Sequence, residues 1–175
     1  KGLNLNISVN LSVYNIYDIG LVEEITELLS DNITISHHLT FEITESAMME
    51  QPEQAVEVLN QFDKLGVRIS IDDFGTGFSS LAYLKRLPVD ELKIDKSFIL
   101  EMHDNENDAV IVRSTIDLAH NLGLEVVAEG TENQDIYDLL GILGCDTAQG
   151  YHISRPLPLS ELQDWLQPAY AHKNK

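Results

Sequence analysis

The sequence predicts an α/β fold, a TIM-like (β/α) barrel that is incomplete within this chain. Short strand patterns alternate with helical patterns along the 175 residues, and this order favours a parallel sheet with right-handed crossovers. The strand patterns alternate polar and apolar side chains, whereas strands of an open doubly wound sheet read as continuous apolar runs. A complete barrel takes eight strand–helix units and about 250 residues, and this chain gives about six units. We therefore expect the first two strands upstream of Lys1, or a partner chain that supplies the missing wall.

The first half of the chain reads as strands that are each followed by a helix. In the first strand, Asn6, Ser8 and Asn10 share one face, and apolar residues share the other, which we expect under the helices. Pro52 suits the first turn of a helix, and Gly66 suits its end. The expected elements are a strand over 3–11, a helix over 18–29, a strand over 38–44, a helix over 52–66 and a strand within 69–77.

The second half continues the same rhythm. Its expected elements are a short helix over 79–86 stopped by Pro88, a strand over 91–95, a helix over 107–121, a strand over 125–129, a helix over 133–143, a short strand over 145–149 and a final helix from Leu159. Trp165 in that last helix is expected to be a core anchor. We expect one partial barrel domain over 1–168 and a polar tail over 169–175.

Composition narrows the function classes. The formal net charge of −18 repels nucleic acid polymers and anionic lipid, so we expect neither partner for this chain. The same charge suits divalent cations. A single cysteine, Cys145, leaves no intramolecular disulfide and favours a reducing, cytoplasmic location. No apolar run approaches the ~20 residues that a membrane-spanning helix needs.

Acidic and amide side chains stand at the carboxyl ends of the expected strands. In chain order the last inward-facing residues are Asn10, Glu42, Asp72, Asp95, Glu129 and Gln149. Asp73 and Lys93 lie beside them, and Glu45 and Glu132 each follow a strand-end glutamate by three residues. Because barrels place their chemistry at the carboxyl ends of the strands, we expect these side chains to meet at one mouth.

Such a cluster predicts divalent metal ions. Convergent carboxylates without a counter-charge are costly to bury. Oxygen ligands without histidine or cysteine favour Mg²⁺ or Mn²⁺ over Zn²⁺. Several acids around a shared Asp72 suit two ions a few ångströms apart, an arrangement that holds an attacking hydroxide and a leaving oxygen in line at phosphorus. Taken alone, Asp72-Asp73 before a glycine-rich turn also fits a solvated turn.

Lys93 admits two interpretations. A lysine on a barrel strand can form a Schiff base, which requires a neutral amine. Here Asp95 shares its face and further carboxylates surround it, and these keep the ammonium charged. We therefore favour a contact of Lys93 with phosphate or with metal-bound water.

Residues 72–81 read Asp-Asp-Phe-Gly-Thr-Gly-Phe-Ser-Ser-Leu, which resembles the hallmark loop of bacterial EAL-domain cyclic-di-GMP phosphodiesterases. Further motifs of that family stand in order along nearly the whole chain: Asn10-Leu11-Ser12, Phe41-Glu42-Ile43-Thr44-Glu45-Ser46, Lys93-Ile94-Asp95, Ala128-Glu129-Gly130-Thr131-Glu132 and Gln149-Gly150-Tyr151. The resemblance implies a TIM-like barrel that hydrolyses one phosphodiester bond of cyclic di-GMP, giving linear pGpG in bacterial second-messenger signalling.

The resemblance also implies a ligand set of two metal ions. Asn10, Glu42 and Asp72 would bind one Mg²⁺ or Mn²⁺. Asp72 would bridge to a second ion, which Asp73 and Glu129 would also hold. Glu129 has a second implied role, as the base that activates the water.

For the remaining motif residues the resemblance implies supporting roles. Lys93 and Asp95 would order the nucleophilic water and the phosphate. Glu45 would brace the loop that follows the paired aspartates. Glu132 and Gln149 would support the site or the nucleotide.

The chain departs from the family pattern at two points. The Glu-Ala-Leu segment, which carries a metal-ligand glutamate, is not in this sequence, and Thr131 stands where the family usually has valine. The fragment by itself is therefore expected to be weak or inactive. A non-catalytic cyclic-di-GMP receptor module and a purely structural dimerisation domain remain alternatives. The resemblance further implies a homodimer through the helix near 79–87, with regulatory domains upstream.

Overall fold

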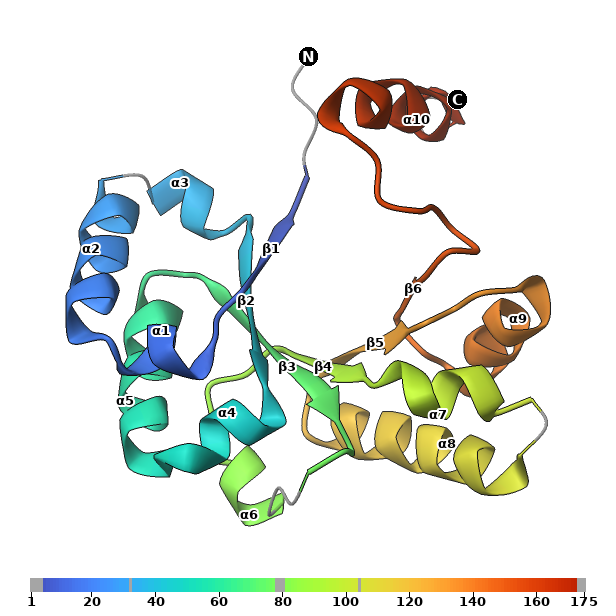
Figure 1. Ribbon diagram of the computed structural model, residues 1–175, viewed down its shortest axis with the longest axis horizontal. Coiled ribbons are helices and arrows are strands. Elements are labelled where there is room, and N and C mark those ends of the chain that lie inside the picture. Colours follow the sequence, from blue (N-terminus) through green and yellow to red (C-terminus); the bar gives the residue numbers. More distant parts are fainter. Residues whose placement is uncertain (1–4, 32, 78–80, 104, 173–175) are drawn as a thin grey trace.

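The computed structural model describes residues 5–31, 33–77, 81–103 and 105–172. Its strands form one six-stranded sheet in the order β1-β2-β3-β4-β5-β6, and every neighbouring pair is parallel. The sheet curls into a half-barrel with helices around its outer side (Figure 1). The predicted α/β fold, a barrel incomplete within this chain, is confirmed.

Each expected strand is present, although the first is shorter than the expected range 3–11, of which residues 3 and 4 lie outside the described part. The strands are β1 Ile7–Asn10, β2 Leu39–Thr44, β3 Arg68–Phe74, β4 Glu91–Ile94, β5 Glu125–Glu129 and β6 Thr147–Gln149. β6 begins later than expected because the residues before it serve other elements. Cys145 donates its backbone N–H to Leu140 at the end of the preceding helix, and the Asp146 carboxylate accepts from the backbone N–H of Val126.

The helices include four that the sequence reading missed. They are α1 Val13–Tyr17, α2 Ile19–Ser30, α3 Ile33–Ser36, α4 Glu45–Glu50, α5 Pro52–Lys64, α6 Leu81–Leu84, α7 Lys96–Glu101, α8 Glu106–Asn121, α9 Gln134–Leu143 and α10 Leu159–His172. The missed helices α1, α3, α4 and α7 are too short to show a helical period. Their detectable signals were capping residues: Ser12, Thr44 and Asp95 accept backbone hydrogen bonds at the starts of α1, α4 and α7.

Two expected helix positions need comment. The helix expected over 79–86 is described only as α6, Leu81–Leu84, and residues 79 and 80 lie outside the described part. The tail expected over 169–175 begins inside α10, whose backbone stays helical to His172. The domain boundary at 168 therefore remains a prediction.

The apolar faces of the inner strands and the helices form one core. Phe41, Ile43, Ile69, Ile71, Leu92 and Val126 are all buried from β2 to β5. Phe41 meets Phe62 of α5 edge to face, with ring centroids 4.9 Å apart, a favourable aromatic geometry. This packing fixes the inner strands under the helices and leaves their opposite, polar face toward the barrel interior.

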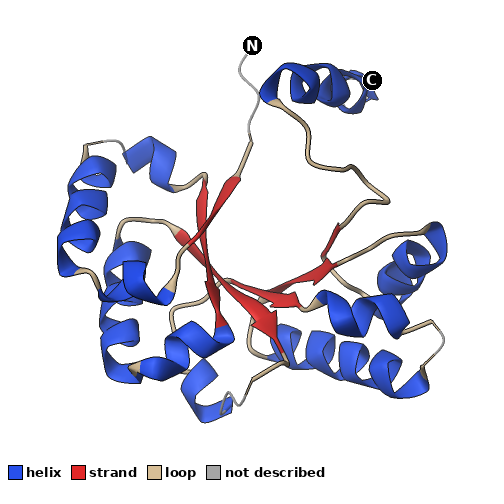
Figure 2. Cartoon of the chain, viewed as in Figure 1, coloured by secondary structure: helices blue, strands red, loops and turns tan. Residues whose placement is uncertain are grey.

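β1 does not follow the expected burial. Its apolar face was expected under helices, but Ile7 is 58% exposed and Val9 is 40% exposed. The reason is its position: β1 and β6 are the two ends of the described sheet, and Figure 2 shows them on either side of an open gap. An end strand has only one neighbour, so part of its surface stays uncovered.

Trp165 was expected to anchor the core, and this prediction is wrong. The side chain is 44% exposed, because α10 lies apart from the sheet and the other helices (Figure 1). Trp165 instead lines a hollow of about 330 Å³ with Tyr151 and Arg155. The Arg155 guanidinium lies 4.4 Å from the centroid of the Tyr151 ring in that hollow, a cation–π distance.

Candidate metal centre and active site

The parallel register brings the predicted site residues to one rim of the sheet. Asn10 lies beside Glu42 on the neighbouring strands β1 and β2, and Asp72 lies beside Thr44 on β3 and β2. Glu129 lies beside Gln149 at the ends of β5 and β6. The carboxyl ends of parallel strands share an edge of the sheet, which is why residues far apart in sequence meet here.

Lys93 lies at the centre of the carboxylates. Its ammonium nitrogen is 2.8 Å from Glu42 Oε2, 3.1 Å from Asp72 Oδ1 and 2.7 Å from Glu129 Oε1. The lysine side chain is only 3% exposed. An ammonium has three donors, and here each one has a carboxylate partner.

This environment decides the charge of Lys93. Burial alone lowers the pKa of the Lys93 amine, but hydrogen bonds to Glu129 and Glu42 raise it overall. The amine therefore stays protonated, and a protonated amine cannot attack a carbonyl carbon. The Schiff-base interpretation is inconsistent with this geometry, in which the Lys93 ammonium contacts three carboxylates at once.

Asp72, Asp73 and Glu129 form a possible metal-binding group. Each offers a carboxylate oxygen, and these oxygens all lie within 4.8 Å of one another. Neighbouring residues of a regular strand point to opposite faces, so Asp72 and Asp73 need a break in the strand to converge. Asp73 supplies it with a left-handed backbone, φ 55°, where the register between β3 and β4 also shifts. Its backbone N–H donates to Asp72 Oδ1 at 3.0 Å.

Burial and repulsion within this group shift the pKa values of Asp73 and Glu129. Burial and the negative charges of Asp72 and Asp95 raise the pKa of Asp73. Burial also raises the pKa of Glu129, although its hydrogen bond with Lys93 opposes the rise. One ammonium therefore does not offset all the negative charge at the mouth. A donor set of carboxylates alone fits hard divalent cations such as Mg²⁺ or Mn²⁺.

Glu45 holds the loop that follows the paired aspartates. The side chain is buried at the start of α4, and its Oε2 accepts from the backbone N–H of Gly75 at 3.1 Å and of Gly77 at 3.3 Å. A Cβ on Gly77 would lie 2.9 Å from the Glu45 carboxyl carbon, closer than real Cβ contacts. The glycine therefore lets the loop approach the carboxylate.

Asp95 serves mainly as the cap of α7. Its carboxylate accepts from the backbone N–H of Ser97 at 3.0 Å and from the Ser97 hydroxyl. Burial raises the pKa of Asp95, but these hydrogen bonds outweigh it, and the net shift is downward. An ionised Asp95 beside Asp73 adds negative charge to the mouth.

The ends of β5 and β6 form the far wall of the site. Glu129, Glu132 and Gln149 line a hollow of about 260 Å³ together with Lys96 and Tyr151. Asn10, exposed at the end of β1, lines a different hollow of about 540 Å³ that it shares with Glu42. Sequence reasoning missed Lys96; its signal was its place directly after Asp95 in the first turn of a helix.

Comparisons with known proteins give the family. A family model described as EAL domain matches residues 2–156. This chain belongs to the EAL-domain family. Among curated relatives, it is 44% identical over 157 residues to the bifunctional diguanylate cyclase/cyclic di-GMP phosphodiesterase MucR of Pseudomonas aeruginosa, covering 90% of this chain and 23% of that protein. It is 42% identical over 163 residues to the cyclic di-GMP phosphodiesterase NbdA of the same organism, covering 93% of this chain and 21% of NbdA.

Solved EAL structures agree. The PaMucR phosphodiesterase in complex with c-di-GMP matches with a TM-score of 0.85 and 44% identity, covering 90% of this chain and 64% of that one. The EAL domain of Mycobacterium smegmatis DcpA matches with a TM-score of 0.85 and 39% identity, covering 93% of this chain and 73% of that one. The EAL chain described here thus spans only about a fifth of the curated relatives' length.

Thr131 lies in the loop after β5, between Gly130 and Glu132. It is fully buried, and its hydroxyl has no hydrogen-bond partner among the described residues. Its backbone joins the two loops of the far wall: the N–H donates to Gln149 O at 3.0 Å, and the carbonyl accepts from His152 N at 3.0 Å. The hydrogen bonds that connect these loops are therefore made by the backbone of Thr131, and an apolar side chain of similar shape would fit.

The membrane question has a limited answer. Over the described ranges, no helix of this EAL chain combines the length and the apolar character needed to cross a bilayer.

Proposed function

We propose that the protein containing this chain hydrolyses one phosphodiester bond of cyclic di-GMP to linear pGpG, with two bound Mg²⁺ or Mn²⁺ ions. The observation that carries the proposal is the convergence of Asp72, Asp73 and Glu129 within 4.8 Å at the carboxyl ends of parallel strands. The names of the relatives support it, since MucR and NbdA are called cyclic di-GMP phosphodiesterases. So does the solved c-di-GMP complex of PaMucR.

The residues proposed to bind the two metal ions lie along the rim formed by the carboxyl ends of the strands. Asn10, Glu42 and Asp72 would hold one ion, and Asp72, Asp73 and Glu129 the other. Bound there, the ions would lower the pKa of a water ligand and neutralise charge on the phosphate oxygens.

The chain's own side chains have separate tasks in this proposal. Lys93 keeps Glu42 and Glu129 in place and presents its positive charge to the mouth. Glu129 is half-buried with a raised pKa, which brings a carboxylate closer to the pKa that suits a general base. Asp95 would help to order the attacking water, and Glu45 fixes the loop behind the paired aspartates.

The far wall would receive the nucleotide. Glu132 and Gln149 line the hollow beside Glu129, where amide and carboxylate groups can hydrogen-bond a guanine or a ribose. Tyr151 is more than half exposed in the same hollow. Arg155 lies over one face of its ring, and the opposite face would stack on a base.

The open gap in the sheet needs a further element in the active protein. β1 and β6 end the described sheet, and the chain covers only 64% of the solved PaMucR chain. We propose that a preceding segment supplies the missing strands and the glutamate of the Glu-Ala-Leu motif. We further propose a cytoplasmic homodimer that pairs through the region of α6, with regulatory domains upstream.

The test compares this chain with a polypeptide that begins roughly 60 to 80 residues earlier, the shortfall expected from barrel size. The longer protein should convert cyclic di-GMP to pGpG only with Mg²⁺ or Mn²⁺. Asp72→Asn keeps the shape of the side chain and removes its charge, and it should lower kcat by about 10² or more. A loss below tenfold would count against the proposal.

The receptor alternative has its own outcome in the same experiment. Calorimetry with cyclic di-GMP, followed by product analysis after long incubation with Mn²⁺, separates binding from turnover. Binding by the longer protein without any pGpG would support the non-catalytic receptor and overturn the hydrolase.

A further inference from the structure

The junction between α4 and α5 leaves backbone carbonyls without helical donors. α4 ends at Glu50 and α5 begins at Pro52, and Gln51 between them has a non-helical backbone, φ −137° and ψ 79°. In a continuous helix the carbonyls of residues 47 and 48 would accept from the N–H groups of residues 51 and 52. Proline has no N–H, and the turn at Gln51 moves its own N–H away from the helical position.

Two tyrosine hydroxyls replace the missing hydrogen bonds. Tyr17 of α1 donates to Ala47 O at 3.1 Å and accepts from Gln51 N at 2.9 Å, so its hydroxyl is inserted between a carbonyl and an amide that a helix would pair directly. Tyr83 of α6 lies 3.2 Å from Met48 O and 3.1 Å from Pro52 O. Its single proton is therefore shared between two carbonyls.

Tyr83 is built into the structure as a donor. The side chain is buried, and burial raises its pKa, so the hydroxyl keeps its proton. Removing the hydrogen-bond donor of a buried carbonyl leaves that carbonyl unsatisfied and destabilises the fold. The adjacent contact of Arg86 with Glu53 at 3.0 Å is exposed on both sides and contributes little. The hydroxyl is therefore the main polar contact between α6 and the junction.

The segment that follows the paired aspartates is attached to α4 at two points. The carboxylate of Glu45, the first residue of α4, accepts hydrogen bonds from the backbone N–H groups of Gly75 and Gly77. The backbone carbonyl of Met48, one turn later, accepts a hydrogen bond from the Tyr83 hydroxyl. The two described parts of the segment that follows β3, residues 75–77 and α6, are thus each hydrogen-bonded to this short helix, while residues 78–80 between them lie outside the described part.

We propose that Tyr83 is a positioning residue for Asp73. Its hydroxyl fixes the second attachment of the loop, and this keeps the Glu45–Gly75–Gly77 contacts in register behind the Asp73 carboxylate. The effect on the loop follows from the contacts alone. The effect on metal binding rests on the proposed function.

The first experiment needs no metal and no substrate. Amide hydrogen exchange at Gly75 and Gly77 is measured in the intact, ion-free protein for Tyr83→Phe and Tyr17→Phe. Both variants remove a hydroxyl from the same junction, but only Tyr83 lies on the helix that follows the loop. Protection at Gly75 and Gly77 should fall about fivefold in Tyr83→Phe, as for one lost hydrogen bond of about 1 kcal/mol, and less than twofold in Tyr17→Phe. Equal protection in the two variants would overturn the proposal.

The second experiment asks whether the loop reaches the metal site. Mn²⁺ binding to the intact protein is titrated calorimetrically for Tyr83→Phe and for Ile116→Val, a substitution in the buried core of α8 with a comparable expected loss of stability. Tyr83→Phe should weaken Mn²⁺ binding about three- to fivefold, and Ile116→Val should leave it unchanged. Equal weakening would reduce Tyr83 to a purely structural residue. No Mn²⁺ binding by the unsubstituted protein would refute the proposed function, while the hydrogen-exchange result would still decide the placement of the loop.

Discussion

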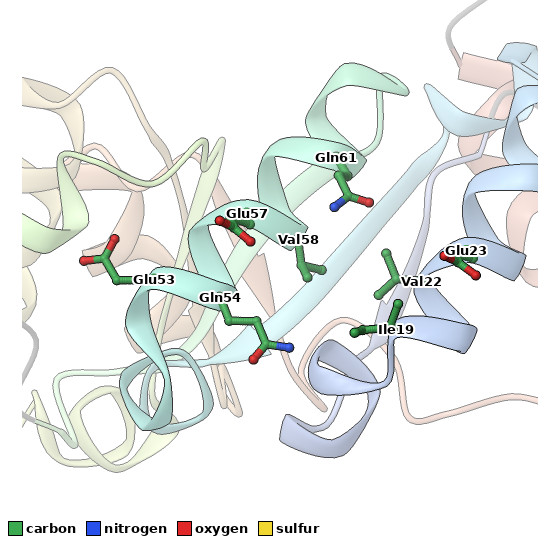
Figure 3. Close-up of a pocket in the computed structure, with 8 residues that line it drawn as sticks. All are labelled: Ile19, Val22, Glu23, Glu53, Gln54, Glu57, Val58 and Gln61. Carbon is green, nitrogen blue, oxygen red and sulfur yellow. The ribbon is translucent and has the colours of Figure 1, made fainter.

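Two acidic regions of this molecule differ in almost everything except their charge. At the mouth of the half-barrel, Glu42 and Lys93 are buried and paired. Between α2 and α5 lies a groove of about 560 Å³, lined by Glu23, Glu53 and Glu57 around an apolar floor, as Figure 3 shows. The three groove glutamates are exposed, and the hollow is larger than the one beside Glu129, about 260 Å³.

The difference lies in what positions the carboxylates. At the mouth they come from the ends of separate parallel strands, which the sheet forces to one edge. In the groove, Glu53 and Glu57 project from the surface of one helix, four residues apart, where water solvates each of them. Hollow size and number of acids therefore do not identify the site; convergence and burial around a shared counter-charge do.

The largest expected effect comes from removing the positive charge of Lys93, which tests whether a shared counter-charge distinguishes the mouth from the groove. Lys93→Met leaves three carboxylates without their common partner, and breaking a buried pair in this way costs about 3–5 kcal/mol of unfolding free energy. Urea unfolding of the ion-free protein should show that loss. Saturating Mg²⁺ should recover part of it, because ions would then neutralise the same carboxylates.

The matched control lies beside the groove. Arg86 pairs with Glu53 at 3.0 Å, but the two side chains are 56% and 80% exposed. Arg86→Met should change the unfolding free energy by no more than about 1 kcal/mol. Similar losses for the two variants would mean that burial does not distinguish the two regions.

The mouth could be predicted from the sequence because strand ends in a parallel sheet share an edge. Polar alternation located the strands, and their last residues gave Glu42, Asp72 and Glu129. The conformation of Asp73 could not be predicted, because its left-handed backbone depends on contacts made by the following loop. The three partners of Lys93 depend on side-chain packing across several strands, which no local pattern encodes.

The failures of sequence reasoning have a related cause. The burial of β1 was predicted from its alternation, but Val9 stays exposed because an end strand lacks a second neighbour. Trp165 was expected in the core because of its residue type, yet its helix lies apart from the sheet. In both cases the sequence pattern indicated an apolar side chain that could be buried, but the described residues do not fully cover it.

A smaller effect is expected for Thr131, a buried polar residue at the mouth whose hydroxyl has no hydrogen-bond partner among the described residues. Thr131→Val removes an unsatisfied buried group and should leave stability unchanged or raise it by about 1 kcal/mol. Turnover of cyclic di-GMP by the longer protein should stay within twofold, because the backbone contacts with Gln149 and His152 remain. A clear loss of stability in urea would show that the hydroxyl has a partner in solution, and Thr131 would then join the paired polar groups of the mouth.

The smallest effect is expected in the groove itself. Glu57→Gln removes one of its charges while keeping the side-chain shape, and the carboxylate it replaces is exposed and makes no hydrogen bond or ion pair recorded among the described residues. Surface changes of this kind usually stay within about 0.5 kcal/mol, and turnover should change less than twofold. Steady-state kinetics of Glu57→Gln and Asp72→Asn should be measured side by side. Loss of one carboxylate at the mouth should lower kcat about a hundredfold, whereas loss of one in the acidic groove should leave kcat almost unchanged. A tenfold loss of turnover in Glu57→Gln would instead mean that the groove is coupled to the strand ends. The number of acidic residues in a hollow would then be enough to indicate a functional site.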